Sequence, residues 1–172
     1  ASPEKVTPAK VMTDTKVTEK KPAPPSPITI STREAYLKLA SNGAALKNST
    51  TIWACVEDIK SGLIWEVKSN NDGIRDKEHL YSWFDPSQTG GITDGGRCKG
   101  NISCDTHAYV QAMNQQKLCG HDDWRLPTRE EMQSLIYFDN ENTKTRINNE
   151  YFPEAMASWY WTASSNEDNP NY

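Results

Sequence analysis

The sequence predicts a loop-rich α+β domain that is stapled by disulfides and preceded by an extended arm. Three observations predict it: two successive strand-like runs, two later segments with helix-capping residues, and four cysteines, all in the same part of the chain. At 172 residues the chain has the length of one ordinary domain with an appendage. We assign residues 1–30 to the arm, 31–50 to a short helix and linker, and 51–172 to the domain.

Charge and composition differ between the arm and the domain. Residues 1–50 carry eight Lys/Arg and four Asp/Glu, a net charge of +4, whereas residues 51–172 carry eleven and nineteen, a net charge of −8. An acidic domain repels polyanions, which argues against a nucleic-acid partner. Residues 1–30 are rich in Lys, Thr and Pro, so we expect an extended arm. No stretch reaches the roughly 18 apolar residues that a membrane span needs.

The cysteines predict export from the cytosol. Their even number predicts two disulfides, and the small residues at the N-terminus resemble what remains after a signal-peptidase cut. Reduced thiols and a zinc site are the alternatives, but zinc is disfavoured because no CxxC pair exists. Three pairings are open. We favour Cys98–Cys104, which closes a small Gly-containing loop, and Cys55–Cys119, which ties the first strand to the central motif.

The first elements are predicted from periodicity and capping. Residues 31–41 predict a short helix that Ser31 or Thr32 caps and Gly43 ends. The alternating runs TIWACVED (51–58) and SGLIWEVK (61–68) predict a hairpin. Five side chains of this hairpin are expected on one side: Trp53, Cys55, Leu63, Trp65 and Val67.

A glycine-rich loop of about forty residues follows and is expected to be held by a crosslink. The run DTHAYVQAMNQQ then predicts a helix that Asp105 or Thr106 caps. Its predicted apolar stripe consists of Ala108, Tyr109, Ala112 and Met113. Residues 118–120 end this helix.

The central motif LCGHDDWRLPTREEMQSL (118–135) predicts a definite local structure. Pro127 cannot sit inside a helix, and Thr128 followed by Glu131 predicts a capping box. The next helix is expected from Arg129 to about Phe138, with Met132, Leu135 and Ile136 inward, and SWYWTASS (158–165) has strand character. We interpret five residues of the motif as structural: Trp124, Arg125, Pro127, Thr128 and Glu131.

No residues are assigned to catalysis or to a metal. The sequence has no HExxH, nucleophile elbow, P-loop or dinucleotide fingerprint, and its three histidines are expected on the surface. An enzyme would have to use His121 with Asp122 and Asp123, or a free Cys119 beside His121. The same aspartates, and residues 139–142, supply oxygen ligands for calcium, but turn formation is the preferred interpretation. We expect no cofactor.

All six tryptophans lie in the domain. Aromatic side chains stack on sugars and on other flat apolar surfaces. We expect Trp53, Trp65, Trp124 and Trp161 in the core, because each lies in a strand-like motif. The candidate ligand-binding residues are Trp83, Trp159 and Tyr160.

Three runs carry a family resemblance: WACVEDIKSGLIWEVK, GGRCKGNISC with the helix and central motif that follow, and INNEYFPEAMASWYWTASS. Together, from about Trp53 to Ser165, they resemble the bacterial Lcl C-terminal domain, named after a collagen-like adhesin and formerly a domain of unknown function. The WRLPT block is also similar to C-type lectin-like and formylglycine-generating-enzyme folds, which implies a twisted antiparallel sheet with two main helices. The oxidase chemistry does not carry over, because the working cysteines of those enzymes come late in the domain and none follows Cys119 here.

The resemblance implies a secreted, cell-surface, appendage-linked or periplasmic bacterial module. Because family members continue further, we expect this domain to lack its last strands, which a partner would supply. Our first hypothesis is a non-enzymatic binding or assembly module, an adhesin or filament subunit. Its partner would be a protein, through self-association or a surface complex, or a glycan. The alternatives are a periplasmic enzyme or enzyme accessory and a calcium-dependent lectin.

Overall fold

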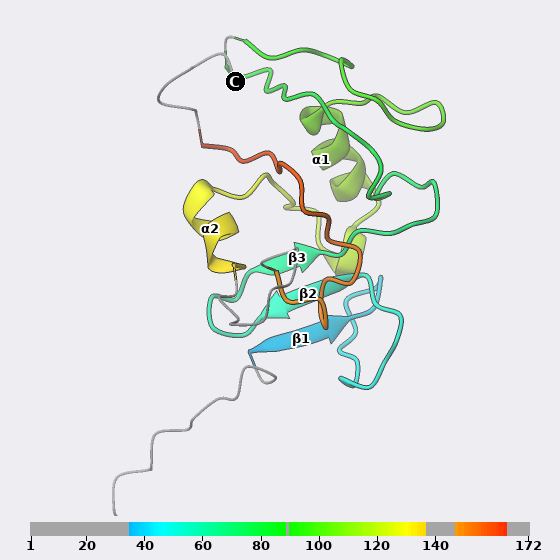
Figure 1. Cartoon of the computed structure of the whole chain (residues 1–172), viewed down its shortest axis with the longest axis vertical. Helices are drawn as coiled ribbons and strands as arrows, with labels where there is room; N and C mark the ends of the chain where they lie inside the picture. The colour runs from blue at the N-terminus through cyan, green and yellow to red at the C-terminus, as the bar shows by residue number, and fades with distance from the viewer. Residues whose placement is uncertain (1–34, 89, 137–146, 165–172) are drawn as a thin grey trace, which may run out of the picture.

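The computed structural model describes residues 35–88, 90–136 and 147–164, which form a small antiparallel sheet and two helices (Figure 1). The strands lie in the order β1-β2-β3. The segment 147–164, orange to red in Figure 1, runs past the β3 end of the sheet and between the two helices. The elements are β1 (Tyr36–Leu39), β2 (Cys55–Asp58), β3 (Ile64–Glu66), α1 (Thr106–Gln115), a 3₁₀ turn η2 (Leu118–Gly120) and α2 (Arg129–Ser134).

The hairpin β2–β3 is confirmed, but the predicted face of Cys55 is wrong. The register pairs Val56 with Trp65 and Cys55 with Glu66. Since neighbouring residues of a strand point to opposite sides, Cys55 and Trp65 lie on different faces of the sheet. Trp65 packs with Trp53 and Val67 as predicted. The strand begins only at Cys55. The in-and-out alternation of side chains in β2 therefore does not extend back through residues 51–54.

The predicted helix over residues 31–41 is also wrong in its described part. Tyr36–Leu39 forms the edge strand β1, in which Tyr36 pairs with Asp58 and Leu39 with Cys55. The apolar stripe that suggested a helix is short. The backbone ladder to β2 supplies hydrogen bonds and burial that outweigh so small a local preference. The amide N–H of Leu46 donates to the carbonyl of Lys38 and so covers part of the outer edge of β1.

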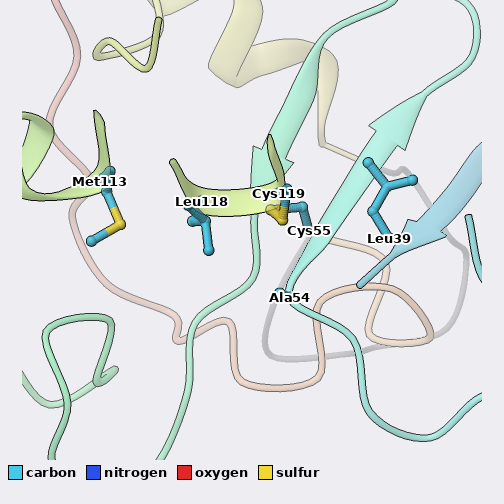
Figure 2. Close-up of a cluster of buried hydrophobic side chains, with 6 residues drawn as sticks. All are labelled: Leu39, Ala54, Cys55, Met113, Leu118 and Cys119. Carbon is cyan, nitrogen blue, oxygen red and sulfur yellow. A yellow bond between two sulfur atoms is a disulfide. The ribbon is translucent and has the colours of Figure 1, made fainter. Parts of the chain in front are cut away.

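Two apolar clusters lie on the two faces of the sheet. The first joins the sheet to α1 and η2 and contains the disulfide Cys55–Cys119 (Figure 2). The second contains Val56, Leu135, Tyr151 and Phe152. The other disulfide joins Cys98 to Cys104, so the favoured pairing is confirmed for all four cysteines. The first crosslink therefore connects the central strand to the central motif through the core.

Both helix caps are confirmed. The side chain of Asp105 accepts a hydrogen bond from the amide of Ala108, and Thr128 and Glu131 form a reciprocal capping box. Helix α2 ends at Ser134, four residues before the expected end. Ile136, expected inward, is 37% exposed because it lies beyond the last helical turn. The predicted continuation to Phe138 lies outside the described residues.

The segment SWYWTASS forms no strand over its described residues, 158–164, which corrects the prediction. Its backbone bonds are sparse: the amide of Ala163 donates to the carbonyl of Pro127, and the amide of Ser158 to that of Met156. Extended residues form a strand only when a neighbouring strand completes the ladder. No described strand is hydrogen-bonded to this segment in a ladder.

The long loop before α1 is irregular and crosslinked, as predicted. It is held by isolated bridges such as Leu80 with Arg97 and Ser82 with Asp105. The carboxylate of Asp76 is buried and accepts hydrogen bonds from the amides of Asn71, Asp72 and Glu78. These bonds hold the pKa of Asp76 below its usual value. Buried polar caps therefore take the place of an apolar core in this loop.

Candidate binding cleft

A cleft of about 860 Å³ opens beside β3. Its base is the strand itself, from Leu63 to Glu66. One wall comes from α1, including Tyr109 and Met113, and the other from the central motif and α2. Residues 155, 156 and 158–161 also line it, and we call this segment the rim. Residues 77–81, Ile147 and Phe152 line it as well, so the cleft is built from segments that are far apart in sequence.

The rim carries large exposed apolar side chains. Trp159 is fully exposed at 100%, and Trp161 is 39% exposed. The hydroxyl of Tyr160 accepts from the amide of Met156 at 2.9 Å and donates to its carbonyl at 3.1 Å, which closes a tight turn. The indole N–H of Trp161 donates to the carbonyl of Tyr81 at 2.6 Å and ties the rim to the loop before α1. The rim is therefore held at both ends while the Trp159 ring projects freely.

Two residues that line the cleft each have a buried polar atom with no hydrogen-bond partner among the described residues: Trp65 Nε1 and Glu66 Oε1. The other oxygen of Glu66 lies 3.1 Å from Lys68 Nζ, which donates to the Tyr109 hydroxyl at 3.2 Å. Burial, followed by the nearby negative charge of Glu66, raises the pKa of Tyr109. Burial likewise raises the pKa of Tyr81. The cleft lining therefore combines neutral phenols with one buried donor and one buried acceptor that have no described partner.

The residues of the central motif brace the opposite wall. Arg125 binds Glu131 through two hydrogen bonds of 2.8 and 2.6 Å, and the amide of Thr128 donates to the same carboxylate at 2.8 Å. The Arg125 hydrogen bond is the main cause that lowers the pKa of Glu131 to about 2. Trp124 Nε1 donates to the carbonyl of Leu118 at 3.0 Å. These contacts give the motif the structural role that its sequence predicts.

The candidate ligand-binding residues separate into two groups. Trp159 and Tyr160 lie at the cleft, whereas Trp83 is half-buried and lies away from it, with its ring against Gly91. Trp161, expected in the core, is instead exposed at the rim. Trp65, Tyr81 and Trp161 also line the cleft, although their sequence context did not predict it. The clustering of aromatic residues in 159–161 is the one signal that pointed to this rim.

Of the residues that the enzyme alternative would use, His121 and Asp123 line the cleft, whereas Cys119 and Asp122 do not. Cys119 is bonded to Cys55 and offers no thiolate, which removes the proposed nucleophile. Asp122 pairs with Lys117 at 3.0 Å, which lowers the pKa of the Asp122 carboxyl. His121 Nδ1 lies 3.6 Å from Asp123 at the surface.

The histidines differ from one another in their surroundings. His79, expected on the surface, is only 8% exposed. Its Nε2 accepts a hydrogen bond from the amide of Lys99, which holds the loop around residue 99 against the imidazole. His107 is half-buried, with its ring at right angles to that of Phe84. The buried imidazole of His79 therefore has a structural role in the hydrogen bonding of the long loop before α1.

Among the described residues, no group of three or more His, Cys, Asp or Glu side chains is placed to hold a metal. The possible calcium ligands at 139–142 lie outside those residues. Neither described helix has the length and apolar character that crossing a bilayer requires.

Comparison with known protein families identifies the family of this chain. The model of the Lcl C-terminal domain matches residues 54–172, which is more than half of the chain. No curated protein and no solved structure matches the chain significantly.

Proposed function

The chain belongs to the Lcl C-terminal domain family, and we propose that it is a non-enzymatic bacterial module, exported from the cytosol, that binds or assembles with a partner through the cleft beside β3. The two disulfides support an oxidising location such as the periplasm, the cell surface or the medium. We further propose a lectin-like scaffold, in which loops around a small sheet carry the binding residues.

One observation carries this proposal: a fully exposed tryptophan stands at the rim of a large apolar cleft. Contiguous apolar surface that opens to solvent is typical of binding sites for proteins or ligands. Tryptophan and tyrosine are enriched at such sites because they bury much apolar area and lose little conformational freedom. Trp159, Tyr160 and Trp161 provide three of them in succession.

The polar groups of the cleft favour binding over catalysis. Two of the charged residues at its walls are held in ion pairs: Lys77 with Glu154 at 2.6 Å and Arg125 with Glu131 at 2.6 Å. A nucleophile activated by a base and an orienting group is the usual arrangement for acyl transfer. The described cleft residues do not form such an arrangement, since the two open atoms belong to an indole and a carboxylate.

Exchange of Trp159 for serine tests the proposal. The full chain and Trp159→Ser are compared on an array of neutral and acidic glycans, and in sedimentation equilibrium for self-association. Ile52→Ser is the matched control, since Ile52 is an exposed apolar residue that does not line the cleft. We expect the wild type and Ile52→Ser to bind a glycan, to self-associate, or both. In Trp159→Ser the affinity of that binding should fall by about tenfold or more. Equal binding by both variants, or none by the wild type, would refute the cleft as the binding site.

A further inference from the structure

The outer edge of β3 carries backbone groups with no partner in the described part of the chain. The amide of Val67 donates to the carbonyl of Ala54, and the amide of Asp58 to that of Leu63. In an antiparallel pair, alternate residues point their N–H and C=O toward the partner strand and the others point them away. Leu63, Trp65 and Val67 therefore face β2, and Ile64 and Glu66 present two N–H and two C=O groups to the other side.

This free edge runs along the base of the cleft. Leu63 to Glu66 all line it, and the buried Glu66 Oε1 and Trp65 Nε1 lie on the same strand. The opposite edge of the sheet differs, because residues 44–46 partly cover β1. An open strand edge beside apolar pockets is the arrangement that accepts an added strand: the main chain provides hydrogen bonds, and alternate side chains enter the pockets.

We propose that residues 28–32 of a second copy of this chain, Ile-Thr-Ile-Ser-Thr, add to β3 as a fourth strand. This inference rests on the proposed function and names its partner. The segment lies outside the described residues, in the stretch that precedes β1. It alternates isoleucine with hydroxyl residues and is rich in β-branched side chains, which strands favour. Ile28 and Ile30 would enter the cleft on one face of the added strand.

Chain length requires that the donor be another copy. Ala35 is fixed beside β1, since its carbonyl accepts from the amide of Ile59 at 3.0 Å. A strand outside β3 would lie about 14 Å from β1, three strand spacings away. Three residue steps from Thr32 to Ala35 span at most about 11 Å. The segment therefore cannot reach the β3 edge of its own domain.

Charge complementarity supports the same donor. Residues 20–33 carry Lys20, Lys21 and Arg33 and no acidic residue, whereas residues 51–172 carry a net charge of −8. Opposite net charges draw the arm of one copy toward the domain of the next. Because the donor and acceptor surfaces differ, the contact is head-to-tail and can extend to rings or filaments.

The test measures sedimentation and hydrogen exchange of the full chain together over a wide concentration range. We expect the average mass to rise beyond that of one chain with increasing concentration, while the amides of Ile64 and Glu66 become protected. Ile30→Asp should weaken this association by about tenfold or more. Val11→Asp places the same charge elsewhere in the arm and should associate as the wild type does.

A mixing experiment then tests the head-to-tail geometry. Ile30→Asp has an intact cleft but an altered arm, and Trp159→Ser has an intact arm but an altered cleft. In a mixture, the arm of Trp159→Ser can therefore bind only the cleft of Ile30→Asp. We expect a one-to-one dimer that grows no further, although each variant alone remains monomeric.

Three outcomes would overturn the inference. The first is a monomer whose Ile64 and Glu66 amides exchange freely at every concentration. The second is a monomer whose protection is lost in Ile30→Asp, which would place the chain's own arm at the edge. The third is association that Ile30→Asp leaves unchanged. Glycan binding that depends on Trp159, without self-association, would refute this inference and leave the proposed function standing.

Discussion

Lys38 Nζ lies 3.5 Å from the centre of the Trp53 ring. The lysine side chain is buried, with only 4% of the residue exposed, and Nζ also donates to the carbonyls of Asn48 and Thr50 at 3.1 and 3.0 Å. The Trp53 ring is fixed in turn, because its Nε1 donates to the carbonyl of Tyr151 at 2.9 Å. One charged side chain therefore joins β1 to the loop before β2 and to the second apolar cluster.

Replacement of Lys38 by methionine should lower the free energy of unfolding by about 2 kcal/mol. The aliphatic stem is kept, but two buried carbonyls lose their donor and the aromatic ring loses its cation. Lys47→Met makes the same change at an exposed position and should have an effect within about 0.5 kcal/mol of zero. Denaturant unfolding measures both. Equal midpoints for the two variants would show that the buried cation contributes no net stability.

The two disulfides should differ in their contribution to stability. Cys55–Cys119 spans 64 residues and Cys98–Cys104 spans 6. A crosslink removes more entropy from the unfolded chain when it closes a longer loop, so we expect losses of about 4 and about 2 kcal/mol for the respective double alanine variants. Guanidinium unfolding under non-reducing conditions measures these losses. A larger loss for the short loop would mean that its native contacts dominate over chain entropy.

Stability should fall in acid through Glu131. The pKa of its carboxyl is about 2 in the folded chain, against an ordinary value of 4.5. The contribution is therefore complete above about pH 4.5 and is lost as the pH falls toward 2. Glu131→Gln should be less stable than the wild type at neutral pH, and the difference should shrink on acidification. Melting temperatures across this range test it, and a constant difference would assign the effect to shape instead of charge.

Gly96 should not tolerate a side chain. A Cβ at this position would collide with the carbonyl oxygens of Leu80 and Cys104. Both belong to backbone that the short disulfide and the bridge of Leu80 with Arg97 hold in place. We expect Gly96→Ala to cost about 3 kcal/mol. Gly100→Ala meets no atom within 4 Å but has a φ of 80°, so its cost should be about 1 kcal/mol. Thermal unfolding ranks the two, and the reverse order would contradict the packing described here.

Local patterns predicted the features that depend on neighbours in sequence. Asp105 and Thr128 cap helices through amides three residues away. The β2–β3 hairpin follows from two alternating runs joined by a short turn. The pairing of Cys98 with Cys104 follows from the small loop between them. In each case the partner lies within one turn or one hairpin, so spacing alone constrains the geometry.

Apart from the Cys55–Cys119 disulfide, features that depend on distant segments were predicted poorly. Tyr36–Leu39 forms a strand because β2 offers it a ladder, whereas its residues alone suggested a helix. Trp161 was expected in a core strand and instead lies at the cleft rim, where its N–H bonds the carbonyl of Tyr81, 80 residues away. Position along the chain does not show which segment will lie opposite another.

The sequence by itself determined the caps, the hairpin, the crosslinked loop and the family, because capping, alternation and cysteine spacing act over a few residues and leave a readable pattern. Only the tertiary structure decided the face on which Cys55 lies, the conversion of a helix-like stretch into β1, and the cleft beside β3. These depend on strand register, on the pairing of β1 with β2, and on contacts between distant segments such as Trp53 with Tyr151, whose energies appear only when the chain is folded.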